Sequence, residues 1–174
     1  MRAEVAILIC LVVVSQCQFV DVFNMGESGY FCIKIPDLLV TGNGTLIAFG
    51  EGRVGSCSDF TWTDLVYKRS FDGGNTWSAL SILYSNSTQN VTNVIGNAAP
   101  IQERTTGRIL VPFCRNNLEV WLIYSDDDGS SWSTPQQIPN VVHRDWHWVA
   151  TGPPASLQLQ SGKLIFIHWI IADS

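Results

Sequence analysis

A pattern of eight residues occurs twice in this chain, and it restricts the possible folds more than any other feature. "SFDGGNTW" at 70–77 and "SDDDGSSW" at 125–132 both read Ser-x-Asp-x-Gly-x-(Thr/Ser)-Trp, with an offset of 55 residues. A second marker, glycine and a basic residue before an apolar run, recurs at Gly107 and Gly162 with the same offset. Two independent markers that share one offset indicate an internal repeat of the size of a β-propeller blade.

Between these markers the chain reads as short strands. β-Branched, aromatic and aliphatic residues dominate, Gly, Asn, Asp and Ser occupy the joints, and no helical periodicity follows the first twenty or so residues. Four antiparallel strands for each repeat fit one propeller blade. We therefore predict an all-β fold with one set of four strands over 37–84, a second over 97–138, and a third set that begins with 154–160 and 163–169.

The repeated runs are interpreted as turns between the third and fourth strands of a blade. Their aspartates can accept bonds from turn amides, their glycines can take a positive φ, and their tryptophans can pack beneath the turn. A carboxylate binding site is the alternative, but each run supplies its own donors, which favours the structural role. The residues concerned are Ser70, Asp72, Gly74 and Trp77 in the first run and Ser125, Asp127, Gly129 and Trp132 in the second.

Composition restricts the class of protein. The chain has 174 residues, of which 46% are hydrophobic and 14% charged, so it is expected to fold around a core. A net charge of -5 argues against nucleic-acid and anionic-membrane partners. No stretch after residue 20 is apolar enough to span a bilayer. No Cys or His spacing suggests zinc and no calcium loop is present, so no metal or other cofactor is expected.

The N-terminus reads as an export signal. Residues 1–17 contain Arg2, an apolar run over 5–14 and then small residues, which predicts a cleaved secretory signal peptide. A buried helix or an uncleaved anchor is the alternative. Three glycosylation sequons agree with export, although Asn-Gly at 43–44 also favours a hairpin turn. The sequon asparagines are Asn43, Asn86 and Asn90.

Three cysteines follow the predicted signal, namely Cys32, Cys57 and Cys114. With an odd number at least one remains unpaired or bonds elsewhere, and the spacing does not select the pair.

The repeated run resembles the Asp box, or BNR repeat, and three further stretches make the chain similar to the sialidase (neuraminidase) family. These are "FCIKIPDLLVTGNGTLIAFGEGR" (31–53), "SCSDFTWTDLVYKRSFDGGNTW" (56–77) and "DWHWVATGPPASLQLQSGKL" (145–164). The resemblance implies a six-bladed propeller, of which residues 28–174 supply about two and a half blades. It also implies exo-α-sialidase activity on sialylated glycans, in a secreted or lysosomal protein.

The resemblance assigns roles to three residues. Asp59 matches the acid/base aspartate, which protonates the leaving oxygen, although a turn-capping role is the alternative. Arg53 matches an arginine that lines the substrate pocket. Lys34 stands where the family has one of three arginines that bind the substrate carboxylate, and lysine keeps the charge but loses the two-pronged geometry. Substrate binding is then weaker, or the protein is a non-hydrolytic homologue that binds glycans or proteins.

Other parts of the family site have no match here. The resemblance implies that the two remaining arginines, a tyrosine nucleophile and its glutamate partner belong to blades beyond Ser174, so we expect a partial propeller. Trp146 and Trp148 either wall the pocket or pack between blades.

Overall fold

The computed structural model describes residues 19–152 and 156–172. The predicted signal peptide, residues 1–17, lies outside them. Apart from one short 3-10 turn, η1 (Glu27–Gly29), the regular elements of the described residues are β-strands, which confirms the all-β prediction. No described helix has the length and apolar character needed to cross a membrane.

The first sheet is an antiparallel meander that matches the first predicted blade. Its strand order is β1-β2-β3-β4. β2 is buried along nearly its whole length, whereas β1 alternates between half-buried and exposed residues after the buried Cys32. A register shift interrupts the β1–β2 pairing between Lys34 and Asp37. The strands are β1 (Cys32–Val40), β2 (Leu46–Arg53), β3 (Thr63–Ser70) and β4 (Ser81–Tyr84).

The second sheet has a divided first strand. Both β5 and β6 pair with β7, and β8 and β9 follow in order. The prediction of one continuous strand over 97–103 is wrong, because Asn97 has a positive φ of 57° and its N–H donates to Glu51 in the first sheet. The strands are β5 (Ile95–Gly96), β6 (Ile101–Gln102), β7 (Ile109–Arg115), β8 (Glu119–Ser125) and β9 (Gln136–Gln137).

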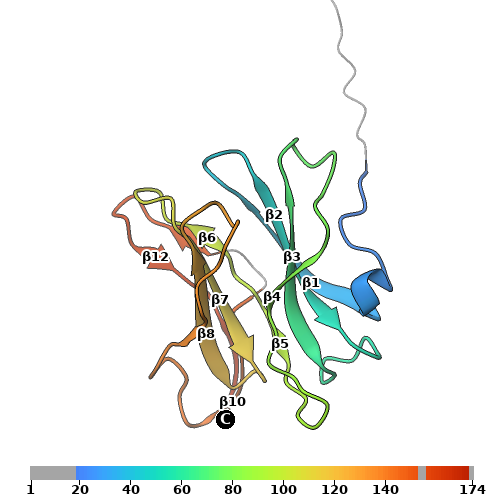
Figure 1. The fold of residues 1–174 in the computed structure, drawn as a ribbon. Helices are drawn as coiled ribbons and strands as arrows, with labels where there is room; N and C mark the ends of the chain where they lie inside the picture. The colour runs from blue at the N-terminus through green and yellow to red at the C-terminus, as the bar shows by residue number, and fades with distance from the viewer. Residues whose placement is uncertain (1–18, 153–155, 173–174) are drawn as a thin grey trace, which may run out of the picture.

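The C-terminal part forms two small two-stranded sheets. β11 (Leu157–Gln158) pairs with β12 (Leu164–Ile165), which confirms a hairpin at the start of the third predicted set. β10 (Trp146–Ala150) pairs with β13 (Trp169–Ala172), a pairing that the sequence did not predict. The prediction of one strand over 163–169 is wrong, because β12 ends at Ile165 and Trp169 belongs to β13, which pairs with β10. The sheets do not close on one another, as expected of a partial propeller (Figure 1).

The main core lies between the first and second sheets, which stand side by side in Figure 1. Trp132 packs edge-on against Phe49 and Tyr67, with ring centroids 6.0 and 5.7 Å apart. The buried residues of this core come from both sheets and the segments that join them: Ile47, Phe49, Leu65, Leu83, Ile95, Ala98, Ile109, Val111, Phe113 and Ile123.

The first repeated turn is held by its own side chains. Asp72 accepts bonds from the Thr76 N–H at 2.9 Å and from the Thr76 hydroxyl at 2.6 Å. The Ser70 hydroxyl donates to Asp72 and accepts the Gly74 N–H at 2.9 Å. These bonds are those expected of a self-contained turn, and Gly74 has a φ of 92°.

The second turn repeats this arrangement and also joins the sheets. Asp127 accepts from the Ser131 N–H and hydroxyl, and Ser125 bonds to Asp127 and Gly129. Arg69 of the first sheet donates to the Ser130 hydroxyl in this turn at 2.8 Å. The turn is therefore also part of the contact between the two sheets.

Candidate functional site

A pocket of about 530 Å³ opens between the first sheet, the segment that enters the second sheet, and the β10–β13 pair. Its polar lining is drawn mainly from β2 and the loop after it, and its apolar lining comes from β13 and from several other segments. The lining residues are Ile35, Glu51, Arg53, Asp59, Phe60, Val94, Asn97, Asn117, Trp148, Gly152, Trp169, Ile170 and Ile171. The pocket thus contains two of the three predicted site residues, Arg53 and Asp59.

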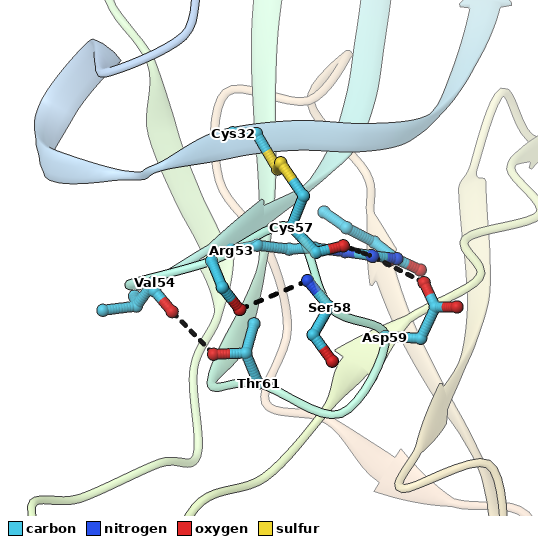
Figure 2. The surroundings of a disulfide bond; sticks show 9 residues. Cys32, Arg53, Val54, Cys57, Ser58, Asp59 and Thr61 are labelled. Atoms are coloured by element: carbon cyan, nitrogen blue, oxygen red, sulfur yellow. Dashed lines mark hydrogen bonds and ion pairs between the residues drawn. A yellow bond between two sulfur atoms is a disulfide. The ribbon is translucent and has the colours of Figure 1, made fainter.

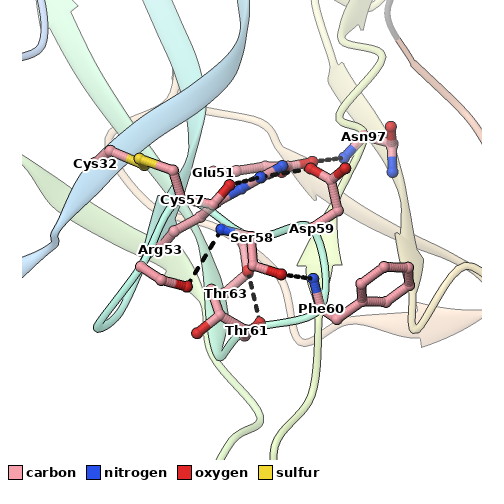
Figure 3. A network of polar contacts seen from close by, with 11 residues as sticks. Cys32, Glu51, Arg53, Cys57, Ser58, Asp59, Phe60, Thr61, Thr63 and Asn97 are labelled. Carbon is pink, nitrogen blue, oxygen red and sulfur yellow. Dashed lines mark hydrogen bonds and ion pairs between the residues drawn. A yellow bond between two sulfur atoms is a disulfide. The ribbon is translucent and has the colours of Figure 1, made fainter.

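Arg53 is the last residue of β2, and its guanidinium joins two carboxylates (Figure 3). Nη2 lies 2.6 Å from Glu51 Oε2, and Nη1 lies 2.5 Å from Asp59 Oδ1. Nη1 also donates to the Cys57 carbonyl at 2.7 Å. Only 3% of the Arg53 side chain is exposed. An arginine fork with this many bonds has a defined orientation, because its planar geometry allows few alternatives.

Glu51 is the buried partner that links the site to the second sheet. Its Oε1 accepts the Asn97 N–H at 3.0 Å, and its other oxygen faces Arg53. Burial raises the pKa of the Glu51 carboxyl, while the bonds from Arg53 and Asn97 oppose that shift. No sequence motif assigns Glu51 a role. Its position two residues before Arg53 on one face of a strand was the available signal.

Gly96 makes room for this carboxylate. A Cβ atom at Gly96 would collide with the side chain of Glu51, so the close approach of β5 to β2 requires glycine there. Nothing in the local pattern around Gly96 marks it as part of a site, because the contact joins residues in different sheets.

Asp59 lies on the loop between β2 and β3, and 77% of its side chain is exposed. Its Oδ1 accepts from Arg53, and among the described residues no hydrogen bond or ion pair reaches Oδ2. The carboxylate is therefore oriented on one side and open to the pocket on the other.

The cysteine pair that the spacing did not select is Cys32 with Cys57. They form a disulfide with Cα atoms 5.9 Å apart (Figure 2). Cys114 is a free, buried thiol. Burial raises the pKa of Cys114 to about 11.

Lys34 lies next to the pocket but is not among the residues that line it. It is exposed and stands opposite Glu51 in the β1–β2 pairing, at the register shift. The next residue, Ile35, has a positive φ of 48° and does line the pocket. The structure therefore brings Arg53 and Asp59 together and leaves Lys34 beside them on the edge strand.

Trp146 and Trp148, both on β10, lie in different surroundings. Trp148 lines the pocket, whereas Trp146 packs against the rings of His143 and His168, at 6.3 and 5.6 Å between centroids. The three sequon asparagines, Asn43, Asn86 and Asn90, are all exposed.

The site consists of carboxylates, guanidinium and amide groups. Among residues 19–152 and 156–172, no three or more His, Cys, Asp or Glu side chains gather in a way that could hold a metal ion.

The curated relatives described here are all named as sialidases. No family model matches the chain. A sialidase of Bacteroides fragilis is 27% identical over 84% of this chain and 32% of its own length. An exo-alpha-sialidase of Aspergillus fumigatus is 25% identical over 79% of this chain and 41% of its own. Sialidase-3 of Bos taurus is 29% identical over 87% of this chain and 40% of its own length.

The solved structures that superpose on this chain include a sialidase and a trans-sialidase. A Hadza microbial sialidase superposes with a TM-score of 0.79 at 26% identity, over 85% of this chain and 34% of that one. A leech intramolecular trans-sialidase superposes with a TM-score of 0.76 at 14% identity, which shows a shared fold. The chain thus spans about a third to two fifths of the length of the curated relatives named here.

Proposed function

We propose that this chain, which belongs to the sialidase family, contributes the acid-bearing part of an exo-α-sialidase site that removes terminal sialic acids from glycans. The observation that carries the proposal is the Glu51–Arg53–Asp59 array. It presents one open carboxylate oxygen at a pocket of about 530 Å³. The tyrosine nucleophile, its partner and two further arginines would come from other blades.

Asp59 is the proposed general acid and base. Cleavage of a sialoside proceeds through an oxocarbenium-like state, and the departing oxygen needs a proton from a positioned carboxyl group. Oδ2 of Asp59 is the atom that would exchange the proton, since Arg53 holds Oδ1 at 2.5 Å. Arg53 is the proposed positioning and pocket-lining cation. Lys34 is the proposed carboxylate-binding cation on the edge strand.

Turnover of sialyllactose by the natural protein tests this function, because its sugar leaving group needs a proton. Asp59→Asn should lower kcat/KM by about 100-fold or more, because the amide cannot supply the proton. Asp126→Asn is the matched control, since Asp126 forms a surface ion pair with Arg108 outside the pocket lining. Equal turnover by the Asp59→Asn variant and the natural protein would exclude Asp59 as the acid.

A glycan-binding protein without hydrolytic activity is the second candidate, and the position of Lys34 favours it. Lysine lacks the arginine fork, and Lys34 is exposed outside the pocket lining. Titration with free sialic acid separates the two functions: the second predicts binding that Arg53→Ala weakens, with no turnover of any sialoside. We further propose that the protein enters the secretory pathway by way of residues 1–17 and is secreted or lysosomal.

A further inference from the structure

The loop of residues 54–62, called the acid loop here, connects β2 to β3 and carries Asp59. The tip of the loop projects from the sheet, and its residues Ser58, Asp59 and Phe60 are exposed. Most of its hydrogen bonds are internal: Ser58 N–H donates to the Ser56 hydroxyl, and Phe60 N–H donates to the Ser58 hydroxyl. Bonds within a loop stabilise its own shape but do not determine where it lies relative to the sheet.

The neck of the acid loop is closed by two bonds. Val54 N–H donates to the Trp62 carbonyl at 2.9 Å, and the Thr61 hydroxyl donates to the Val54 carbonyl at 2.6 Å. These bonds continue the β2–β3 ladder and stop before the tip. They leave residues 55–60 to be positioned by other contacts.

Among the hydrogen bonds, ion pairs and disulfides of the described residues, two connections tie the tip to the first sheet. One is the Arg53 guanidinium, which bonds to the Cys57 carbonyl and to Asp59. The Asp59 end of that ion pair is 77% exposed, so water and salt weaken it. The other is the covalent Cys32–Cys57 bond, which solvent does not weaken.

The disulfide is placed where it can orient the Arg53 contact. Cys32 is buried at the start of β1, opposite Arg53 in the β1–β2 register, and the neighbouring Phe31 N–H donates to the Arg53 carbonyl at 2.8 Å. The bond therefore reaches from the partner strand of Arg53 to the acid loop. It holds the Cys57 carbonyl within 2.7 Å of Nη1 and Asp59 two residues further on.

We propose that the Cys32–Cys57 disulfide is a positioning element of the site, which holds Asp59 at Arg53, and that its reduction releases the acid loop while the sheets remain folded. The catalytic consequence rests on the proposed function of Asp59. The positioning itself does not.

Reduction can be written with balanced electrons. A dithiol reductant attacks one sulfur of the disulfide as thiolate and displaces the other cysteine as thiolate. Its second thiol then displaces the first cysteine from the mixed disulfide. The reductant supplies two electrons and ends as a cyclic disulfide, and Cys32 and Cys57 end as two thiols. Cys57 is half-buried, whereas Cys32 is buried.

Hydrogen exchange followed by mass spectrometry tests the positioning directly. In the dithiol-treated protein and in Cys57→Ser, amides of residues 54–62 should exchange about tenfold faster or more than in the oxidised protein, while those of β3 and β7 keep their rates. Cys114→Ala is the matched control, because Cys114 is in no disulfide, and it should leave the acid loop unchanged. Unchanged exchange in the loop, or equal acceleration in every strand, would overturn the proposal.

Turnover of two sialosides tests the catalytic consequence. An aryl sialoside with a good leaving group needs little acid assistance, whereas sialyllactose needs a proton on its leaving oxygen. Cys57→Ser should therefore lower kcat for sialyllactose about tenfold more than kcat for the aryl sialoside, with similar KM values. Equal losses would exclude an effect through Asp59. A natural protein that turns over neither sialoside would instead contradict the proposed function, and hydrogen exchange would still decide the positioning.

Discussion

Arg53 and Glu51 lie two residues apart on β2, and the Arg53 guanidinium donates from Nε at 3.2 Å and from Nη2 at 2.6 Å to the same Glu51 oxygen. Both side chains are 3% exposed. A buried charge without its partner is costly, so this pair contributes to the stability of the fold as well as to the orientation of Asp59.

Glu51→Gln should lower the free energy of unfolding by about 3 kcal/mol, because it removes the buried countercharge of Arg53. Urea denaturation measures the change. Asp126→Asn provides the comparison, since its pair with Arg108 is about half-exposed on both sides and should show a much smaller loss. If the two variants lost similar amounts of unfolding free energy, burial would not be the reason that the Glu51–Arg53 pair stabilises the fold.

Gly129→Ala should destabilise the protein by about 2 kcal/mol, because Gly129 has a φ of 78° and a Cβ atom there would lie 2.6 Å from Ile47 Cδ1. Gly73→Ala separates the two causes. Gly73 has a similar φ of 71° but nothing within 4 Å of the added Cβ. The Gly73→Ala variant should therefore lose only the part of the unfolding free energy that comes from backbone strain. Equal losses in urea denaturation would exclude a packing role for the second turn.

The repeated turns should make stability fall in acid. Bonds from the Ser131 side chain and N–H and from Ser125 lower the pKa of Asp127 to about 2, and Thr76 and Ser70 do the same for Asp72. A carboxyl whose folded pKa lies below its unfolded value stabilises the fold above the unfolded pKa. That contribution is therefore present above pH 3.8 and is lost as the pH falls towards about 2.

The urea midpoint measured across this pH range checks the acid prediction. Asp127→Asn should show a shallower dependence on pH than the natural protein. Asp21→Asn, which changes an exposed aspartate outside the turns, should keep the original dependence. An unaltered slope in Asp127→Asn would contradict the role of the turn.

Lys34→Arg should tighten the binding of sialic acid about three- to tenfold, because a guanidinium can bind a carboxylate with two parallel bonds. Calorimetric titration measures the change, and Lys163→Arg, on the β11–β12 hairpin away from the pocket, is the control. Weaker binding by Lys34→Arg would show that Lys34 does not face the carboxylate.

Much of the fold could be predicted, because its signals are local. The turns after β3 and β8 supply their own hydrogen bonds within eight residues, so the repeated pattern was sufficient to place them. Alternating and apolar runs placed β2, β3, β7 and β8 for the same reason. The divided strand of the second sheet was missed, since Asn97 turns towards Glu51, 46 residues earlier in the chain.

The sequence by itself determined the strand order within each meander, the repeated turns and the neighbourhood of Arg53 and Asp59, because these depend on residues close together along the chain. Only the tertiary structure decided the partner of Cys32, the burial of Glu51 against Gly96, the edge position of Lys34 and the pairing of β10 with β13. These contacts join segments that lie apart along the chain. Glu51 meets Gly96 because the first two sheets pack against each other, whereas the disulfide and the register of Lys34 belong to the first sheet and its loop, and β10 and β13 form a separate pair. No local spacing encodes which distant segments meet.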